Sequence, residues 1–496
     1  MPNGTEPERT EQPQRATFRH QLYKWLDVRV GIGSILHEAL DEPIPGGARW
    51  AYVFGSVLLF LFISQTITGI FLALYYVPSA ASAHTTVAYI VKEVTGGSFL
   101  RSLHAYGSSA VVIVVLLHLT QTYVYGAYKG RRELLWISGC ILLGLMLAMA
   151  FTGYLLPWDQ KAYFATTVGT NMASDVPFIG TWLKRFMRGG DEMGTLTVSR
   201  FFVAHVFILP AVLIAFIATH VYLFRKAGAA GPTTADPINP KLPTQRFYPR
   251  QVVMDTVVAL VMILILGSLA HFAPTELGPR ANPADTQYIP RPEWYYLPIF
   301  QWLKYWRGPY TIIGIVVIPA ITAALLVLVP FIDRRLERRP WRRPIALGVF
   351  VLILGAFVVM GFMSVRDDRR DPSIATQVAK QRDEVEQFMR QPFEPEGAAT
   401  SLSAPVATVV DPLVAAGKKV YDSESCDACH GENGVGTAAG PKLAGAIAQK
   451  SPEELSNLLR HPTAKMIEGE MKPVDISDED LKALVAYIRS LNKAAD

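Results

Sequence analysis

Seven apolar stretches dominate the chain, and each is long enough to cross a bilayer as a helix. A hydrocarbon layer of about 30 Å needs about 20 consecutive apolar residues in a helix. We therefore expect seven membrane-spanning helices, with a soluble globular composition from about residue 411 onward. The stretches lie at 50–77, 103–126, 134–156, 201–224, 252–273, 310–332 and 345–364.

Basic residues set the expected orientation of these spans. They gather in residues 15–29, in the connections after the second and fourth spans, and most densely at 334–343, before the seventh span. All four segments fall on one side of a seven-span chain, and the positive-inside rule makes that side cytoplasmic. We expect a multi-pass protein of a bacterial cytoplasmic membrane, with its N-terminus inside and its C-terminal region on the outer, periplasmic side.

The composition supports a membrane protein and argues against nucleic acid as a partner. Hydrophobic residues make up 50% of the 496 residues, the mean hydropathy is +0.24, and the formal net charge is only +5. The basic residues lie beside apolar runs, without the interleaved aromatic residues of a soluble nucleic-acid surface.

Four histidines form two spaced pairs on the second and fourth spans. His104 and His118 are roughly 21 Å apart along a helix, and His205 and His220 are roughly 22 Å apart. Both spans enter from outside, so His104 and His205 share the outer leaflet while the other two share the inner one. A single histidine in such a span is usually a hydrogen-bonded core residue. Four at matched spacing favour two noncovalent haems b, each held between two imidazoles.

Glycines on the first and third spans repeat the 14-residue interval of His104 and His118. Gly55 and Gly69 are 14 residues apart, as are Gly139 and Gly153. Glycine lets a flat macrocycle approach the helix backbone, although small residues also serve plain helix packing. Arg101, one turn before the first histidine, is placed either to pair with a haem propionate or to extend its charge to the interface.

The C-terminal region contains a motif for covalent haem attachment. In Cys426-Asp-Ala-Cys429-His430 the two thiols would bond the haem vinyl groups, and the histidine would ligate the iron. We expect one haem c there. Cys140 stands alone in an apolar span, where a packed, unreactive thiol is expected.

Three motifs resemble cytochrome b of the quinol-oxidising cytochrome bc and bf complexes. They are Arg-Ser-Leu-His at 101–104, Gly-Tyr-Leu-Leu-Pro-Trp-Asp-Gln at 153–160 and Arg-Lys-Ala-Gly at 225–228. The spacing of the second histidine pair resembles the chloroplast-type branch. Residues 240–364 resemble the separate three-span subunit of that branch, here joined to the four-span part.

The resemblance implies an all-α fold, with seven transmembrane helices that include a four-helix dihaem bundle and with a small soluble helical domain. A helix is possible at 373–390, inside the linker. The expected segments are a cytoplasmic N-terminal segment at 1–48, the dihaem domain at 49–232, a three-helix quinol-site domain at 233–364, a linker at 365–410 and a cytochrome c domain at 411–496.

The outer connection after the fifth span contains Pro292-Glu293-Trp294-Tyr295. Alone, this tetrapeptide is also compatible with an ordinary interfacial aromatic turn. The resemblance implies that it marks a quinol-oxidation site, in which Glu293 accepts a proton from a quinol hydroxyl. Tyr154, at the outer end of the third span, is expected to line the same pocket.

A second quinone site is implied on the inner side. Phe247-Tyr248-Pro249 followed by Asp255 resembles the family's entry into the fifth span. The resemblance implies that Asp255 delivers a proton to a quinone that is reduced near the inner haem. A solvated carboxylate at the helix start is the alternative.

Two absences distinguish the chain from the complete family pattern. The chloroplast-type protein has a cysteine that binds an extra haem covalently, and Val53 occupies that position here. A third haem in thioether form is therefore not expected, while a noncovalent one stays open. The sequence also has no cluster-binding Cys/His pair of the Rieske kind, so a separate Rieske iron–sulfur protein is an expected partner.

The C-terminal region resembles a class-one cytochrome c. Met-Lys-Pro at 471–473 is followed by Ile-Ser-Asp-Glu-Asp-Leu and an expected last helix at 478–491. This resemblance implies Met471 as the sixth ligand of the haem iron, with Met466 as the alternative.

Together these features predict the membrane subunit of a proton-translocating quinol:cytochrome c reductase. Quinol would be oxidised outside, with one electron passing through the Rieske partner to haem c and the other through both haems b to an inner quinone. A further soluble or membrane-bound acceptor and a homodimeric multi-subunit complex are expected. The alternatives are a dihaem membrane anchor of a dehydrogenase, and a haem electron conduit without a quinone site.

Overall fold

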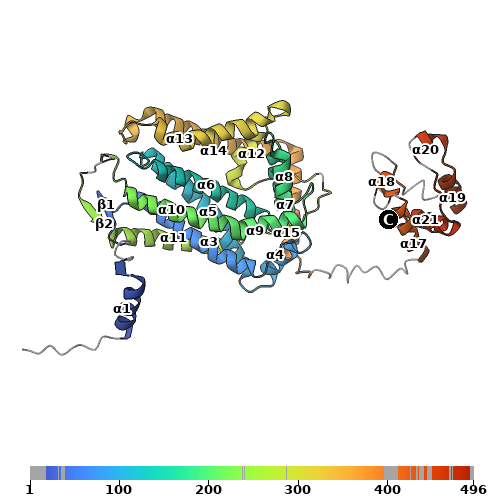
Figure 1. Cartoon of the computed structure of the whole chain (residues 1–496), viewed down its shortest axis with the longest axis horizontal. Coiled ribbons are helices and arrows are strands. Elements are labelled where there is room, and N and C mark those ends of the chain that lie inside the picture. Colours follow the sequence, from blue (N-terminus) through green and yellow to red (C-terminus); the bar gives the residue numbers. More distant parts are fainter. Residues whose placement is uncertain are drawn as a thin grey trace, which may run out of the picture. The chain divides into compact units, whose positions relative to one another are not determined.

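The computed structural model describes residues 18–31, 33–34, 40–236, 238, 241–285, 287–395, 412–424, 426–431, 434, 441–443, 450–468, 471 and 473–491. The chain divides into two compact units, Met1–Glu396 and Gly397–Asp496. Helices form nearly all of the regular structure in both units (Figure 1), which confirms the expected helical class.

Among the described residues of the first unit, seven helices are long and apolar enough to cross a membrane, so the protein is a multi-pass membrane protein as expected. The fourth and sixth each contain a π-helical turn, η2 (Ala204–Ile208) and η5 (Ile313–Val317). The spans are built from η1 (Trp50–Tyr52) with α3 (Val53–Ala73), α5 (Gly97–Val124), α6 (Glu133–Tyr154), α9 (Thr195–Val203) with α10 (Leu209–Ala227), α11 (Arg250–Phe272), α13 (Ile318–Ile332) and α14 (Pro344–Arg370).

The spans pack side by side into a bundle. Helix α3 packs against α5 and α11, and α6 packs against α10 and α13. Helices α13 and α14 form one edge of the bundle in Figure 1. Between α3 and α5 the core is made by small and branched apolar side chains, among them Val57, Leu61 and Val111. The four helices that carry the paired histidines and glycines therefore lie in one compact region.

Short helices lie outside the spans. Helix α1 (Phe18–Val30) precedes the first span, and α4 (Ala83–Lys92), α7 (Gln160–Ser174), α8 (Gly180–Arg188) and α12 (Leu297–Leu303) lie in the connections between spans. Helix α15 (Pro372–Arg390) confirms the helix expected at 373–390. Lys92 Nζ donates to the carbonyls of Phe388 and Gln391, both at 2.7 Å, so α15 is anchored on α4. Helix α15 accordingly belongs to the first unit.

A small sheet and a charged cluster join connections between the spans. Strand β1 (Pro43–Pro45) pairs antiparallel with β2 (Thr244–Arg246), and the helical prediction did not include this pair. Nearby, the carboxylate of Asp333 accepts hydrogen bonds from Tyr128 at 2.6 Å, Lys129 at 2.8 Å and Arg343 at 2.9 Å. Because these partners come from the connections after α5 and α13, the cluster fixes the three-helix part to the four-helix part.

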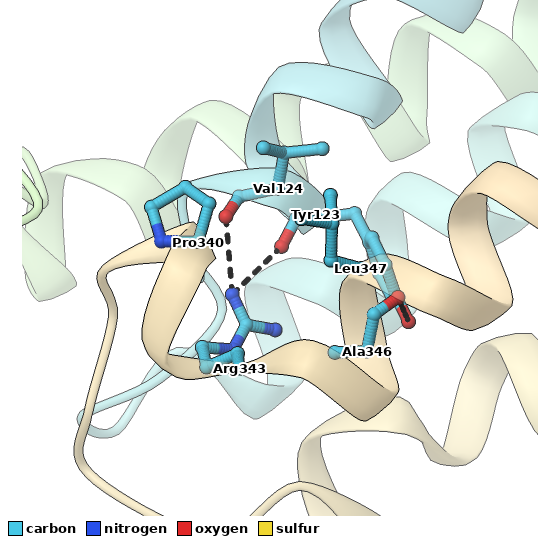
Figure 2. Close-up of a pocket in the computed structure, with 6 residues that line it drawn as sticks. All are labelled: Tyr123, Val124, Pro340, Arg343, Ala346 and Leu347. Atoms are coloured by element: carbon cyan, nitrogen blue, oxygen red, sulfur yellow. Dashed lines mark hydrogen bonds between the residues drawn. The ribbon is translucent and has the colours of Figure 1, made fainter.

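Arg343 completes this junction at the start of α14. Its guanidinium donates to the carbonyls of Tyr123 at 3.2 Å and Val124 at 3.1 Å, the last residues of α5 (Figure 2). Arg343 also lines a shallow pocket of about 170 Å³. Apart from Arg343 its lining is mainly apolar, so it belongs to the packing between α5 and α14.

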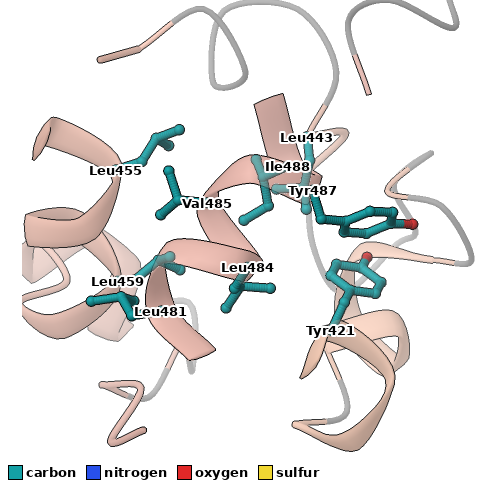
Figure 3. Packing of buried hydrophobic residues seen from close by; sticks show 9 residues of the cluster. All are labelled: Tyr421, Leu443, Leu455, Leu459, Leu481, Leu484, Val485, Tyr487 and Ile488. Carbon is teal, nitrogen blue, oxygen red and sulfur yellow. The ribbon is translucent and has the colours of Figure 1, made fainter. Parts of the chain in front are cut away.

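The second unit is a small helical domain with its own core. Helix α17 (Pro412–Ser423) packs on α21 (Asp478–Ser490), which confirms the last helix expected at 478–491. A side chain at Gly417 would lie 1.9 Å from the Ala483 carbonyl, so this close approach requires glycine. The other helices are α18 (Cys426–His430), α19 (Pro452–Arg460) and α20 (Ala464–Glu468). Figure 3 shows the core residues Tyr421, Leu443, Leu455, Leu459, Leu481, Leu484, Val485, Tyr487 and Ile488.

Candidate haem and quinone sites

The outer histidines face each other across a gap that suits one metal ion. The ring centroids of His104 on α5 and His205 in the π-helical turn are 6.4 Å apart, and the rings are inclined by 78°. An imidazole nitrogen binds a transition metal at about 2 Å, so two rings on opposite sides of one metal have centroids roughly 6 Å apart. The two imidazoles therefore lie at a distance that a bis-histidine haem iron requires.

The inner histidines, His118 on α5 and His220 on α10, are close enough to interact electrostatically. His205 and His220 are 15 residues apart in the sequence, whereas the facing glycines Gly139 and Gly153 are 14 apart. A π-helical turn holds one residue more than an α-helical turn. The turn at Ala204–Ile208 therefore takes up the extra residue.

Each of the four predicted glycines faces one histidine ring rather than a neighbouring backbone. A side chain at Gly153 would lie 2.5 Å from His205 Cε1, too close to be accommodated without movement of that ring. The glycines thus make room for the imidazoles themselves, an arrangement that neither plain helix packing nor approach of a macrocycle predicts. The remaining distances from an added Cβ to the ring Cε1 are 3.2 Å for Gly69 and His104, 3.3 Å for Gly139 and His220, and 3.9 Å for Gly55 and His118.

Hydroxyl groups orient three of the four imidazoles. The Nδ1 atoms of His104, His205 and His220 lie 2.9, 3.2 and 2.8 Å from the hydroxyl oxygens of Thr68, Thr152 and Ser138, respectively. Each hydroxyl donates its proton to a carbonyl of its own helix, at 2.9 Å in all three cases. Its oxygen can then accept a hydrogen bond from Nδ1–H, and that tautomer leaves Nε2 unprotonated and able to ligate a metal.

These donors and this geometry fit haem b, although sequence reasoning missed the three hydroxyl residues. The signal was present, because each of them directly precedes one of the predicted glycines. Arg101 lies near His104 as expected, but its guanidinium donates to the carbonyls of Thr275 at 2.9 Å and Glu276 at 3.1 Å. In this structure Arg101 fixes the connection after α11 to α5.

The predicted quinol-site residues Glu293 and Tyr154 lie close together. The carboxylate of Glu293 forms an ion pair with Lys161 Nζ at 2.8 Å. The same ammonium group lies 5.4 Å from the ring centroid of Tyr154, and the Tyr154 hydroxyl is 3.4 Å from the Arg291 carbonyl. Lys161, which follows the Trp-Asp-Gln motif, was not predicted. It brings a positive charge to the carboxylate that we expected to accept a proton.

The rest of the Pro-Glu-Trp-Tyr segment forms a turn that leads into α12. Following Pro292, residues Trp294 to Tyr296 make one 3₁₀ turn. Tyr295 is buried and Trp294 is exposed. Burial raises the pKa of Tyr296 to about 12, and its hydroxyl donates to the Leu147 carbonyl at 3.1 Å. The turn is thus fixed against α6, and its tyrosines keep their protons at neutral pH.

Asp255 lies on the inner part of α11, beside α3. Its carboxylate accepts hydrogen bonds from Ser56 at 2.7 Å and from Gln251 at 2.8 Å. Ser56 is the neighbour of Gly55, which faces His118. Asp255 therefore contacts a residue of α3 that is adjacent in sequence to the glycine facing His118. Val53, at the position of the extra haem-binding cysteine in the chloroplast-type protein, is buried in the core.

In the second unit, helix α18 carries Cys426, Cys429 and His430. The Nδ1 atom of His430 lies 2.8 Å from the Pro441 carbonyl, which can only accept. This bond leaves Nε2 of His430 free for a metal, as haem c attachment requires. Met471 packs against the core of the unit, and its backbone N–H donates to the Met466 carbonyl at 2.9 Å. Both predicted candidates for the sixth ligand are therefore neighbours.

Three known families match the chain in the order that the fold suggests. The family described as Cytochrome b/b6/petB matches residues 39–228, and Cytochrome b(C-terminal)/b6/petD matches residues 280–381. The family Cytochrome c matches residues 414–492.

Known proteins match the membrane unit over most of its length. Cytochrome b from Cereibacter sphaeroides is 32% identical over 373 residues, which are 70% of this chain and 84% of that protein. The menaquinol:cytochrome c reductase cytochrome b subunit from Bacillus subtilis (strain 168) is 39% identical over 221 residues, 43% of this chain and 99% of that protein. A solved structure, described as a hyperthermophilic respiratory Complex III, aligns with a TM-score of 0.63 and 28% identity, covering 74% of this chain and 96% of that chain.

The spans and the matches define a membrane cytochrome of the quinol-oxidising bc and bf class. The chain belongs to the cytochrome b family, with the b6-type N-terminal and petD-type C-terminal parts joined and with a cytochrome c domain fused at the C-terminal end. Membership in these two families implies haem b and haem c as cofactors.

Proposed function

We propose that the chain is the fused cytochrome b and cytochrome c subunit of a proton-translocating quinol:cytochrome c reductase. The observation that carries this proposal is the 6.4 Å separation of the His104 and His205 rings, with each Nδ1 beside a hydroxyl oxygen that can accept a hydrogen bond from it. Two helices that present imidazoles in this way can hold a haem in each leaflet. The haems supply one-electron carriers at two depths of the membrane.

We assign His104 and His205 to the outer haem b and His118 with His220 to the inner one. In this proposal four glycines leave space for the four imidazole rings, because a side chain at any of them would contact a ring. They are Gly55, Gly69, Gly139 and Gly153. The family resemblance assigns Arg101 to a haem propionate. Some guanidinium N–H groups of Arg101 already bind the carbonyls of Thr275 and Glu276, so the propionate would have to bind the remaining ones.

Glu293 is the proposed proton acceptor for quinol oxidation on the outer side. A quinol that loses two electrons also releases two protons, and a carboxylate within hydrogen-bond distance of its hydroxyl can take one. Glu293 is paired with Lys161, and both side chains are partly exposed, so a proton can leave toward water. Pro292, Trp294, Tyr295 and Tyr154 would form the walls of this site.

Asp255 is the proposed proton donor on the inner side. Hydrogen bonds from Ser56 and Gln251 hold its carboxylate beside the helix surface that faces His118. Electrons that arrive at the inner haem would reduce a quinone there, and Asp255 would pass protons to it from the cytoplasm. Release outside and uptake inside together move protons across the membrane.

The second electron of each quinol requires partners outside this chain. We propose a Rieske iron–sulfur protein as the first acceptor, because the sequence has no cluster-binding Cys/His pair. Cys426, Cys429, His430 and Met471 would hold haem c, which supplies a one-electron carrier between that partner and a soluble or membrane-bound acceptor. The basic connections favour a bacterial cytoplasmic membrane with this domain outside, and the family favours a homodimeric complex.

The direct test is quinol-driven reduction of the b haems by the purified complex carrying Glu293→Gln. Loss of the proton acceptor should slow this reduction at least about tenfold while haem spectra stay unchanged. Glu276→Gln, in the same connection, is the matched control and should retain the wild-type rate. Full-rate reduction by the Glu293 variant would contradict the assignment and favour a dihaem anchor or an electron conduit.

A further inference from the structure

The four glycines that face histidines differ in the residue that precedes them. A hydroxyl-bearing residue precedes three, and an aromatic residue precedes the fourth. The pairs are Thr68-Gly69, Ser138-Gly139, Thr152-Gly153 and Phe54-Gly55. In the first three pairs, the glycine leaves space for the imidazole ring, and the hydroxyl of the preceding residue is an acceptor for the Nδ1–H of that ring.

The exception, Phe54-Gly55, provides no hydroxyl for the imidazole of His118. Among the described residues, Nδ1 of His118 is buried and has no hydrogen-bond partner. Phe54 packs into the apolar cluster between α3 and α5, and the nearest hydroxyl of α3, that of Ser56, donates to Asp255. The hydroxyl of Thr122 donates to the His118 carbonyl instead of receiving the ring proton. His118 therefore differs chemically from the other three histidines.

The two haem positions consequently differ in the number of acceptors around their ligands. At the outer pair, Nδ1 of His104 has Thr68, and Nδ1 of His205 has Thr152 and also the Met149 carbonyl at 3.0 Å. At the inner pair the acceptors are the Ser138 hydroxyl and the Leu135 carbonyl, and both serve His220. A hydrogen bond from Nδ1–H makes Nε2 more electron-rich, which stabilises ferric over ferrous iron and lowers the reduction potential.

We propose that Thr68, Thr152 and Ser138 are positioning residues that set the reduction potentials of the two haems, and that Phe54 raises the potential of the inner haem by withholding the fourth hydroxyl. This inference rests on the proposed function, since it requires two bis-histidine haems. The inner haem then has the higher reduction potential, because its ligands stabilise ferric iron less. Electron transfer from the outer to the inner haem is therefore favourable. The direction of electron transfer, from the outer to the inner haem, therefore depends on which residue precedes each glycine that faces a histidine.

The test is an equilibrium redox titration of the b-haem absorbance in the purified complex with Phe54→Thr and Phe54→Val. These two side chains have nearly the same shape, so both leave the same space in the core and differ only in the hydroxyl. Phe54→Thr should lower the midpoint potential of the inner haem relative to Phe54→Val, and the outer haem should not move. Equal inner-haem potentials in the two variants would overturn the proposal.

A reciprocal pair of variants tests the outer haem without disturbing the Phe54 region. Thr152→Val removes one of the two acceptors of His205, leaving the Met149 carbonyl, and should raise the outer midpoint potential. Thr152→Ser retains the hydroxyl and should keep the wild-type potential. An unchanged outer potential in Thr152→Val would also overturn the proposal. A wild-type complex without two titrating b haems would contradict the proposed function itself, so the two failures are distinguishable.

Discussion

Arg291 and Asp368 form a two-point ion pair that fixes the quinol-site segment to the end of α14. The Nε–Oδ2 distance is 2.7 Å and the Nη2–Oδ1 distance is 2.5 Å, and both side chains are mostly buried. Arg291 directly precedes the Pro-Glu-Trp-Tyr segment, whereas Asp368 lies 77 residues further along the chain. The orientation of Glu293 therefore depends on the last turns of the seventh span.

Arg291→Lys should weaken this attachment, since a lysine cannot make the paired contact of a guanidinium. The lost charged hydrogen bond is worth about 2 kcal/mol, so we expect quinol oxidation to slow by roughly one order of magnitude with unchanged haem spectra. Steady-state reduction of cytochrome c by quinol measures the effect. Arg334→Lys, at an exposed site, is the control, and equal rates in both variants would argue against a positioning role for Arg291.

Asp333→Asn should destabilise the junction between the two membrane parts. Lys129 and Arg343 are almost fully buried beside Asp333, and they would lose their countercharge. Removing one partner of a buried pair costs about 3 kcal/mol, so a clear decrease in the thermal unfolding temperature of the complex is expected. Asp191→Asn breaks the exposed pair with Arg185 and should have little effect. A similar temperature for both variants would contradict the junction.

The pH dependence of that junction follows from Asp333. Burial opposes ionisation, but hydrogen bonds from Lys129 and Tyr128 outweigh it and lower the pKa of Asp333 below its ordinary value. A lowered carboxyl pKa stabilises the fold above the ordinary value, and the stabilisation is lost as the pH falls through the lowered one. The difference between wild type and Asp333→Asn should therefore be constant from pH 5 to pH 8. A difference that disappears in this range would show that the carboxylate is not held ionised.

His84 should make the outer surface of the membrane unit sensitive to mild acid. Its Nε2 lies 2.8 Å from the Gly278 carbonyl, and burial lowers the pKa of His84 despite this bond and the nearby Asp159, with Arg280 and Lys92 adding to the decrease. The folded state then binds fewer protons than the unfolded state, so stability is complete above the ordinary histidine pKa and is lost below it.

His84→Gln keeps a donor for Gly278 but does not titrate. Thermal unfolding at pH 8 and pH 5 should therefore show a smaller loss for this variant than for the wild type. If both proteins lost the same stability on acidification, another group would be responsible.

Met471→Leu should remove the sixth ligand of haem c. The ferric domain should lose the absorption band of methionine-ligated haem while the covalent haem stays attached through Cys426 and Cys429. Met466→Leu, only five residues earlier, is the matched control and should keep the band. The reverse result would assign the ligand to Met466.

The spans were predictable because a run of apolar residues decides both helix formation and membrane insertion. Their ends were not. The fourth span begins at Thr195, before its apolar stretch, and the seventh continues through charged residues to Arg370 because Asp371 starts the next helix. The pairing of Ile44 with Gln245 joins segments that are 200 residues apart, and local patterns carry no signal for such a contact.

The histidine spacing predicted which histidines share a leaflet, because helix geometry converts sequence intervals into depth. The sequence did not show that each glycine faces an imidazole, or that Lys161 pairs with Glu293, since both depend on how neighbouring helices rotate. The hydroxyl-glycine dipeptides were visible beforehand, but their meaning required the contacts of His104, His205 and His220.

The most direct measurement of the central claim is the haem content of the purified chain. Acidic extraction separates noncovalent haem b from haem c, which stays bound to the polypeptide, and pyridine haemochrome spectra quantify both. The four histidines and the Cys426-Cys429-His430 motif predict two haems b and one covalent haem c per chain. A single haem b, or no covalent haem, would contradict the proposed electron path.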